Sequence, residues 1–208
     1  MKGKFITFEG IEGCGKTTQI KLLDEHLQKN GYKTLLTREP GGTEIGDKIR
    51  QILLDPSNKK MCQTAELLLY GASRAQHIEE LINPALFDGK IVLCDRYSDS
   101  TTAYQGAARR LDLEKLDEMD KIATSSLKPD LTIVIDISAR DGLKRATKRG
   151  QPDRLEQEKL DFHERVRKGY LNIAKKEPNR VLVVDGNKDI GTVHRNIIAG
   201  FEKIIGKI

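Results

Sequence analysis

The sequence has little of what marks secreted, metal-binding or membrane proteins. Its three cysteines, Cys14, Cys62 and Cys94, are odd in number and form no C-x-x-C pair, which favours reduced thiols over a disulfide framework. The four histidines show no paired ligand spacing and predict no zinc site; they are His26, His77, His163 and His194. No apolar run reaches the length of a membrane span, and no leader segment is expected before the first strand-like run. We therefore expect a cytoplasmic protein that does not insert into a membrane.

The chain also lacks linkers and repeats. No stretch rich in proline, glycine or serine divides its 208 residues, and hydrophobic residues make up 38% and charged residues 32% of it. These values are typical of a globular protein large enough to bury a sizeable core. We predict a single domain over residues 1–208.

Positive charge is concentrated in one short segment. The net charge is +5, and residues 140–154 alone contain six basic and two acidic residues, a local charge of +4. A confined basic segment fits a compact anion such as a nucleotide triphosphate, and the alternative is a solvated helix face followed by a basic loop. Aromatic residues make up only 5% of the chain, which argues further against a nucleic-acid partner.

Short apolar runs alternate with helical patterns. Four runs predict buried parallel strands at 5–8, 91–94, 131–135 and 181–184, and a fifth strand is predicted at 34–37. Apolar residues at spacings of three and four predict helices between them, for example at 20–27 and 193–205. The alternation predicts an α/β fold with a five-stranded parallel sheet flanked by helices. Residues 149–153 interrupt two helical patterns and are the best candidate for a mobile loop.

The first predicted strand leads into a phosphate-binding loop. Residues 10–17, G-I-E-G-C-G-K-T, match the pattern G-x-x-x-x-G-K-[ST], whose backbone N–H groups converge on phosphate oxygens at a helix N-terminus. In this pattern the lysine reaches the β- and γ-phosphates and the hydroxyl residue binds Mg²⁺. The predicted nucleotide-binding residues are Gly10, Ile11, Glu12, Gly13, Cys14, Gly15, Lys16, Thr17 and Thr18.

A second motif follows the strand at 91–94. Asp95 stands where a P-loop enzyme places the carboxylate of its magnesium shell, so Thr17 and Asp95 are the predicted metal residues. Arg96 then enters the same crevice with donors suited to phosphate. The alternative is that Asp95 only caps a helix.

Two other classes of P-loop protein fit less well. A GTPase switch normally carries N-K-x-D, whereas residues 187–189 have the wrong spacing, and no D-x-x-G follows a strand. A nucleic-acid motor is disfavoured by the short chain and the confined basic segment.

The sequence resembles the bacterial thymidylate kinase family along nearly its full length. The matching segments are F-E-G-I-E-G-C-G-K-T-T at 8–18, T-R-E-P-G-G-T at 37–43, L-L-L-Y-G-A-S-R at 67–74, D-R-Y-S-D-S-T-T-A-Y-Q-G at 95–106 and R-A-T-K-R-G-Q-P-D-R-L-E at 145–156. The resemblance implies the P-loop nucleoside-monophosphate-kinase fold, a lid at about 145–156 and a homodimer. It implies the reaction of ATP with dTMP to give ADP and dTDP, with Mg²⁺; a kinase acting on dUMP or dCMP is the alternative.

The resemblance also assigns roles in acceptor binding. Arg38 and Arg96 are expected to grip the acceptor phosphate, and Glu12 to bind the sugar 3′-hydroxyl. An aromatic residue at the position of Tyr70, usually Phe in the family, stacks on thymine, and Arg74 is expected to contact a base oxygen. The remaining residues of this predicted acceptor site are Pro40, Ser100, Thr101, Tyr104 and Gln105. Without the family pattern, these residues have purely structural alternatives: Arg38 in a surface ion pair, Tyr70 as a core aromatic beside a solvated Arg74, and Glu12 as a solvent-facing loop acid.

The basic segment is expected to form the lid over the donor phosphates. In the family, lid arginines approach the transferring phosphoryl group, and here Arg149 and Arg154 are the candidates, with Arg145 and Lys148 also available. Some eukaryotic members carry an arginine directly after the loop acid, where this chain has Gly13. The predicted catalytic residues are therefore Glu12, Lys16, Arg96, Arg149 and Arg154.

Overall fold

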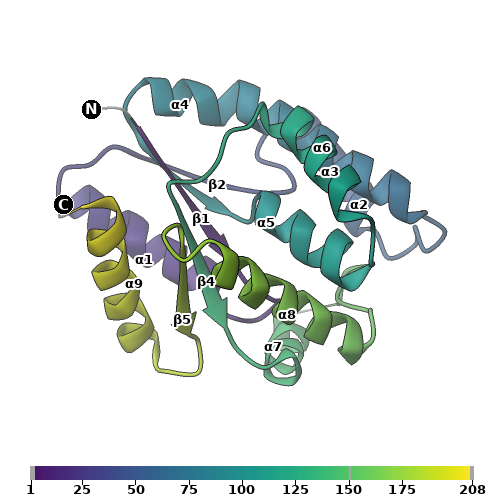
Figure 1. Ribbon diagram of the computed structural model, residues 1–208. Helices are drawn as coiled ribbons and strands as arrows, with labels where there is room; N and C mark the ends of the chain where they lie inside the picture. The colour runs from purple at the N-terminus through teal and green to yellow at the C-terminus, as the bar shows by residue number, and fades with distance from the viewer. Residues whose placement is uncertain (1–2, 150, 207–208) are drawn as a thin grey trace.

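A computed structural model describes residues 3–149 and 151–206, except for the side chain of Arg149. Within these residues five parallel strands form one sheet in the order β2-β3-β1-β4-β5 (Figure 1). The strands are β1 (Lys4–Glu9), β2 (Thr34–Arg38), β3 (Ile91–Asp95), β4 (Leu131–Asp136) and β5 (Val181–Asp185). The predicted five-stranded parallel sheet is confirmed, and each strand continues one or two residues beyond the predicted apolar run.

The prediction of a fully buried strand at 181–184 is wrong in part. β5 lies at the edge of the sheet, so only Val181 and Val184 are buried, whereas Val183 is 42% exposed. The central strand β1 contains buried Phe5, Ile6 and Phe8 and is covered on both faces.

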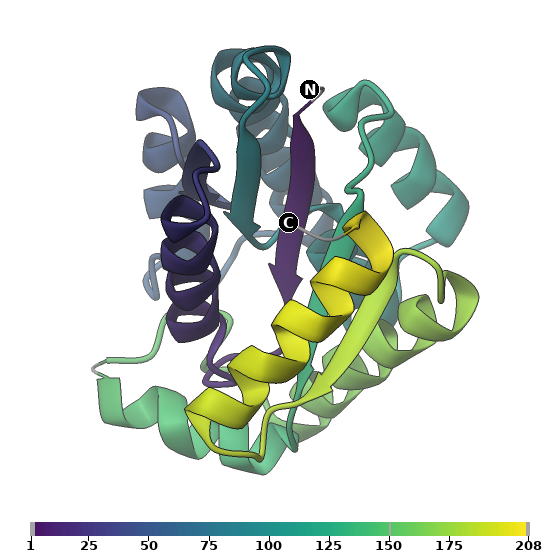
Figure 2. The same ribbon diagram turned by 90° about the vertical axis from the view of Figure 1, so that its left-hand side faces the viewer.

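Helices cover both faces of the sheet. Figures 1 and 2 show α1 and α9 together on one face, and α3, α5 and α8 on the other. The helices are α1 (Lys16–Lys29), α2 (Glu44–Leu54), α3 (Gln63–His77), η1 (Ile78–Ile82), α4 (Asn83–Phe87), α5 (Ser98–Thr101), η2 (Thr102–Ala108), α6 (Leu113–Thr124), α7 (Ala139–Ala146), η3 (Thr147–Arg149), α8 (Leu160–Lys176) and α9 (Ile190–Ile205). Of the predicted loop 149–153, Arg149 is the last residue of η3, and residues 151–153 lie between η3 and α8; Gly150 lies outside the described residues, and the mobility of the segment stays a prediction.

Side chains cap several helices, but not the helix that follows the phosphate loop. Thr43, Asp112, Ser138 and Asp189 accept hydrogen bonds from backbone N–H groups at the starts of α2, α6, α7 and α9. In the described chain α1 has no such cap, because its N-cap residue is Gly15. The partial positive charge at this N-terminus is therefore available to a phosphate.

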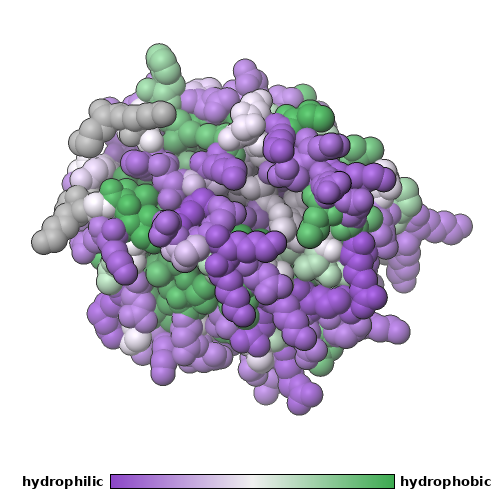
Figure 3. Space-filling view, in the orientation of Figure 1, coloured by the Kyte–Doolittle hydropathy of each residue, from purple (hydrophilic) through white to green (hydrophobic). Residues whose placement is uncertain are grey.

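The surface in the orientation of Figure 1 is mainly hydrophilic, with hydrophobic side chains in separate patches (Figure 3). Most of the large apolar side chains of β1, β3 and β4 form the core. Among the described helices, none combines the length and the apolar composition that a bilayer crossing requires.

Candidate functional site

One cavity of about 410 Å³ lies at the carboxyl ends of β1 and β3, where binding sites of parallel α/β sheets occur. It brings together most of the predicted site residues. Those lining it are Glu12, Gly13, Gly15, Lys16, Thr17, Thr18, Arg38, Pro40, Tyr70, Asp95, Arg96, Ser100, Thr101, Tyr104 and Gln105. The predicted residues that lie behind its wall are Gly10, Ile11, Cys14, Arg74 and Arg154. The side chain of Arg149 lies outside the described residues.

Glycine shapes the phosphate loop. Gly10, Gly13 and Gly15 have φ values of 133°, 71° and 104°, a region that residues with a Cβ rarely adopt. At Gly13 a Cβ would also come within 2.1 Å of the carbonyl oxygen of Gly142 in α7. The loop therefore packs backbone against backbone on the helix that begins the predicted lid.

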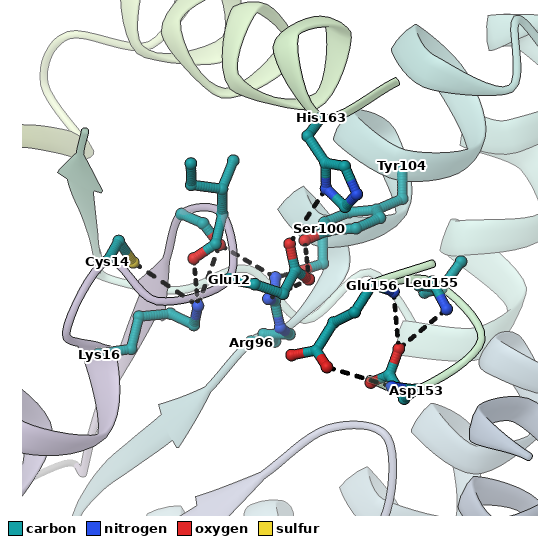
Figure 4. Close-up of polar contacts among 12 residues, drawn as sticks. Glu12, Cys14, Lys16, Arg96, Ser100, Tyr104, Asp153, Leu155, Glu156 and His163 are labelled. Carbon is teal, nitrogen blue, oxygen red and sulfur yellow. Dashed lines mark hydrogen bonds and ion pairs between the residues drawn. The ribbon is translucent and has the colours of Figure 1, made fainter. Parts of the chain in front are cut away.

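Lys16 is folded back onto this loop. Its ammonium group donates to the carbonyl oxygens of Gly10 and Ile11 at 3.0 Å each, and lies 3.7 Å from Cys14 Sγ (Figure 4). Because the side chain still lines the cavity, its positive charge is held in place before any anion binds.

Thr17 and Asp95 meet where the loop faces β3. The Thr17 hydroxyl donates to Asp95 Oδ2 at 3.3 Å, and both residues line the cavity. A hydroxyl and a carboxylate side by side are ligands that suit Mg²⁺, which also binds substrate phosphates. The described residues contain no cluster of three His, Cys, Asp or Glu side chains able to hold a metal. The helix-cap alternative for Asp95 is not what the structure shows, because the N-cap residue of α5 is Tyr97.

Glu12 points toward the far half of the cavity, away from solvent. Its Oε1 accepts from Arg96 Nη2 at 3.0 Å and from the Tyr104 hydroxyl, and its Oε2 lies 3.4 Å from His163 Nδ1 (Figure 4). Burial by itself raises the pKa of this carboxyl, but the charge of Arg96, together with the smaller effects of its other neighbours, outweighs burial and holds the pKa well below its usual range. Glu12 is thus an ionised side chain, and a solvent-facing loop acid is excluded.

Arg96 is the centre of the hydrogen-bond network. It has a φ of 73°, unusual for a residue with a side chain, and its Nη1 donates to Gly10 O, Ser100 Oγ and Tyr170 Oη at 3.1, 3.4 and 3.1 Å. Burial alone lowers the pKa of this guanidinium, but the surrounding phenol and carboxyl groups raise it well above its ordinary value. Arg96 therefore stays charged and in a fixed direction.

A buried acid, Glu9, supports this network from below. Its Oε1 accepts from the backbone N–H of Tyr97 at 2.7 Å, and its Oε2 accepts from Ser100 Oγ and Tyr170 Oη at 2.6 and 2.9 Å. Burial, together with the nearby Asp99, raises the pKa of Glu9 to about 7. Sequence reasoning missed this residue, although the rule that identified Asp95, an acid at the end of an apolar strand, also applies to it.

The far half of the cavity is lined by arginine and aromatic side chains. Arg38, partly exposed, donates to Asp47 at 3.2 Å, and Arg50 donates to the Pro40 carbonyl at 2.8 Å. Tyr70 projects from α3 into the cavity. Arg50 was not predicted, because it belongs to no recognisable motif in α2.

Arg74 is buried rather than solvated. It donates to Glu39 Oε2 at 2.8 Å and to Thr101 Oγ1 at 3.0 Å, and its exposed fraction is 1%. The alternative of a solvated arginine beside a core aromatic is therefore wrong. The structure places Arg74 behind Thr101, which itself lines the cavity.

The predicted lid divides into two parts. Arg145 in α7 lines the cavity. Arg154 instead donates to the Leu53 carbonyl at 2.8 Å, at the C-terminal end of α2, and to Glu66 at 2.6 Å, near the N-terminal end of α3. Glu66 also binds Gln105 and Arg109, and although burial raises its pKa, these partners lower it overall. The basic segment is thus partly a solvated face, with Arg140, Lys144 and Lys148 exposed, and partly a wall of the site.

Asp153 organises the turn that follows. Its Oδ1 accepts from the backbone N–H groups of Leu155 and Glu156 at 2.8 and 2.9 Å, and all three residues line the cavity (Figure 4). These positions lie in the matching segment at 145–156, but none of them was predicted as a site residue, because a motif does not show which side chains of a turn reach the cavity.

A glycine loop of this shape between the first strand and the first helix of a parallel sheet defines the class of P-loop nucleotide-binding proteins. A second half-cavity that opens onto the same loop, lined by arginines and an aromatic ring, is typical of kinases that act on a second small substrate.

Comparison with known proteins identifies the family. The family model described as thymidylate kinase matches residues 8–197. Thymidylate kinase of Geotalea daltonii is 53% identical over 213 residues, covering 99% of this chain and 98% of the relative. That of Thermoanaerobacter sp. is 52% identical over 205 residues, covering 99% and 100%. The crystal structure of thymidylate kinase from Ehrlichia chaffeensis superposes with a TM-score of 0.80 at 34% identity, covering 97% of this chain and 100% of that one. The chain belongs to the thymidylate kinase family, and both the predicted family and the predicted fold are confirmed.

Proposed function

We propose that the protein transfers the γ-phosphoryl group of ATP to dTMP, giving ADP and dTDP. The observation that carries this proposal is a cavity that two substrates can share: the phosphate loop forms one end, the Arg38 and Tyr70 walls form the other, and Glu12 lies between them. Two nucleotides that share one cavity can bring donor and acceptor phosphates together without a covalent enzyme intermediate. The functional unit is the whole chain, 1–208, with its lid at about 145–156.

The donor binds on the phosphate loop. The backbone N–H groups of residues 10–18 surround its phosphates, and Lys16 leaves the loop carbonyls to bind the β- and γ-phosphates. Thr17 and Asp95 would hold Mg²⁺, which when bound neutralises charge on the donor phosphates.

The acceptor binds in the other half. Arg38 and Arg96 grip its phosphate, Tyr70 stacks on the thymine base, and Glu12 accepts a hydrogen bond from the sugar 3′-hydroxyl. Pro40, Ser100, Tyr104 and Gln105 complete the acceptor site. Arg74 acts on the base through Thr101, whose hydroxyl it holds at 3.0 Å.

The rate comes from positioning and from fixed positive charge. Arg96 is oriented by hydrogen bonds before the substrates bind, so little reorganisation of this side chain accompanies the development of charge in the transition state. A lid arginine completes this field when the lid closes and water leaves the site. Arg149 and Arg154 are the candidates on the family pattern, and Arg145 is added because it lines the cavity.

The primary test is an ADP-release assay across dTMP, dUMP, dCMP, dGMP, AMP and UMP. We expect turnover to be highest with dTMP; comparable turnover with a purine monophosphate would contradict the thymine assignment. Removal of Mg²⁺ with EDTA is expected to abolish turnover, and added Mg²⁺ to restore it.

Variants then rank the lid residues. Arg145→Ala, Arg149→Ala and Arg154→Ala are each compared with Arg140→Ala, an exposed residue of the same segment, for kcat and for KM of both substrates. A transition-state arginine is expected to lower kcat by about 10³-fold or more with little change in KM for dTMP. If all three retain the kcat of Arg140→Ala, the basic segment has no catalytic role.

The homodimer and the cytoplasmic location also belong to the proposal. Helix α3 packs between α2 and α6 (Figure 1). These helices expose large apolar side chains that support a dimer surface: Ile45, Ile52, Leu68, Leu113 and Ile122. Size-exclusion chromatography with light scattering tests it: Leu68→Glu is expected to give monomers, whereas Phe87→Glu, on α4, is the control. A Leu68→Glu protein of unchanged mass would contradict this surface.

A further inference from the structure

His163, on α8, is a buried histidine whose polar atoms are left without hydrogen bonds. Its side chain is 1% exposed, and within the described chain neither ring nitrogen has a hydrogen-bond partner. A buried polar group without a partner costs about 1–3 kcal/mol, so a histidine here needs an explanation beyond packing. Sequence reasoning considered His163 only as a zinc ligand and found no reason to select it.

The atom nearest to this ring is part of the site. His163 Nδ1 lies 3.4 Å from Oε2 of Glu12, and Oε2 is also without a hydrogen-bond partner among the described residues (Figure 4). The other oxygen, Oε1, is already engaged by Arg96 and Tyr104. The two oxygens therefore differ: Arg96 and Tyr104 hold Oε1, whereas Oε2 is buried against His163 and lacks a hydrogen bond.

The surroundings keep the ring beside Oε2. Phe162 packs edge-on against His163 with ring centroids 5.4 Å apart, and Arg109 covers Phe162 at 4.8 Å. The 3.4 Å separation is slightly longer than a hydrogen bond, so a small rotation of either side chain closes it. An imidazole with its proton on Nδ1 then donates to the carboxylate.

We propose that His163 is a positioning residue: it holds the buried Oε2 of Glu12, and so keeps the carboxylate turned with Oε1 toward the sugar hydroxyl of the acceptor. Without it, the carboxylate can rotate, and Oε1 loses its fixed direction toward the acceptor. The inference rests on the proposed dTMP kinase function and deepens it, because it adds a specific residue to the recognition of the sugar.

The test compares two acceptors: dTMP and its analogue without the 3′-hydroxyl, 3′-deoxythymidine 5′-monophosphate. His163→Phe keeps a ring of similar shape but removes the donor. We expect KM for dTMP to rise about tenfold, which is the effect of losing one hydrogen bond to a charged group. KM for ATP is expected to stay within about twofold. With the 3′-deoxy acceptor, wild type and His163→Phe are expected to have the same KM within about twofold, because the hydroxyl that Glu12 binds is absent.

Further variants separate positioning from packing. His163→Asn places an amide donor near the position of Nδ1, so its KM for dTMP is expected to lie close to the wild-type value. The double variant Glu12→Gln with His163→Phe is expected to be no worse than Glu12→Gln alone, because His163 acts through Glu12. His26→Phe, a half-buried histidine of α1 that packs against His194 of α9, is the control and is expected to match wild type. Should His163→Phe not fold, His163→Leu, which also lacks a donor, supplies the same comparison between the two acceptors.

The outcomes distinguish this proposal from the function on which it rests. A wild-type protein without dTMP-dependent ADP release refutes the proposed function itself. An active wild type in which His163→Phe raises KM equally for both acceptors, or equally for ATP and dTMP, overturns the role of His163 alone. A folded His163→Asn variant as weak as His163→Phe overturns it as well.

Discussion

Glu9 lies under the site with a raised pKa, which makes the stability of the protein depend on pH in a calculable way. The carboxyl accepts hydrogen bonds from Tyr97 N–H, Ser100 Oγ and Tyr170 Oη, and burial with the nearby Asp99 raises its pKa from 4.5 to about 7. Glu9→Gln removes the charge but keeps the shape. Its amide oxygen can accept from Tyr97, and its NH₂ group can donate to the two hydroxyl oxygens.

The magnitude follows from the difference between the two states. The folded protein holds the Glu9 proton up to about pH 7, whereas the unfolded chain releases it near pH 4.5. The stability that the protonated carboxyl contributes is therefore fully present below pH 4.5 and is lost as the pH rises through 7. A tenfold change in a proton-binding constant corresponds to about 1.4 kcal/mol. For a pKa of about 7 in the folded protein and 4.5 in the unfolded chain, the loss of stability between pH 5 and pH 8 is about 2.5 kcal/mol.

Urea unfolding followed by circular dichroism at pH 5, 6, 7 and 8 measures this effect. The free energy of unfolding of Glu9→Gln relative to wild type is expected to rise by about 2.5 kcal/mol from pH 5 to pH 8. Because both proteins share every other titrating group, those contributions cancel in the difference. Glu44→Gln, an exposed acid on α2, is the control and is expected to change by less than about 0.5 kcal/mol. A difference between Glu9→Gln and wild type that stays constant with pH would show that Glu9 titrates normally.

Two further variants test the packing around the site. A Cβ at Gly142 would lie 2.5 Å from the Glu12 carbonyl oxygen. Gly142→Ala is therefore expected to displace the phosphate loop at a cost of about 1–3 kcal/mol and to lower kcat/KM for ATP about tenfold or more. An unchanged kcat/KM for ATP in steady-state kinetics would contradict this. Arg74→Met leaves Glu39 buried without its main partner and is expected to destabilise the protein by about 3–5 kcal/mol. The control, Lys48→Met, removes one partner of an exposed ion pair and is expected to cost less than about 1 kcal/mol. Equal losses of stability in thermal unfolding would refute the reasoning.

The sequence predicted the sheet and the phosphate loop because both depend on local patterns. Apolar runs report burial directly, and the G-x-x-x-x-G-K-[ST] spacing fixes a loop whose backbone conformation needs glycine. The edge position of β5 was missed, because an apolar run does not reveal how many neighbours a strand has.

Residues that act through distant contacts could not be predicted in the same way. Arg74 belongs to a matching motif, yet only the fold shows that Glu39 and Asp120 bury it behind Thr101. His163 is separated from Glu12 by about 150 positions and belongs to no motif, so their proximity arises only from the packing of α8 over the loop. Sequence patterns identify what binds substrate more readily than what orients those groups.

An acid in the middle of an anion-binding loop is consistent with the electrostatics of this site. Glu9 and Glu12 are three residues apart, yet burial raises the pKa of the first, and Arg96 keeps the pKa of the second low. Since Glu12 is neutralised by Arg96, it does not cancel the charge of Lys16 or the positive end of α1, which remain available to the donor phosphates. The acid and the arginine together form a nearly neutral, hydrogen-bonded wall between the two halves of the cavity. This wall presents a carboxylate oxygen to a hydroxyl on one substrate without repelling the phosphates of the other.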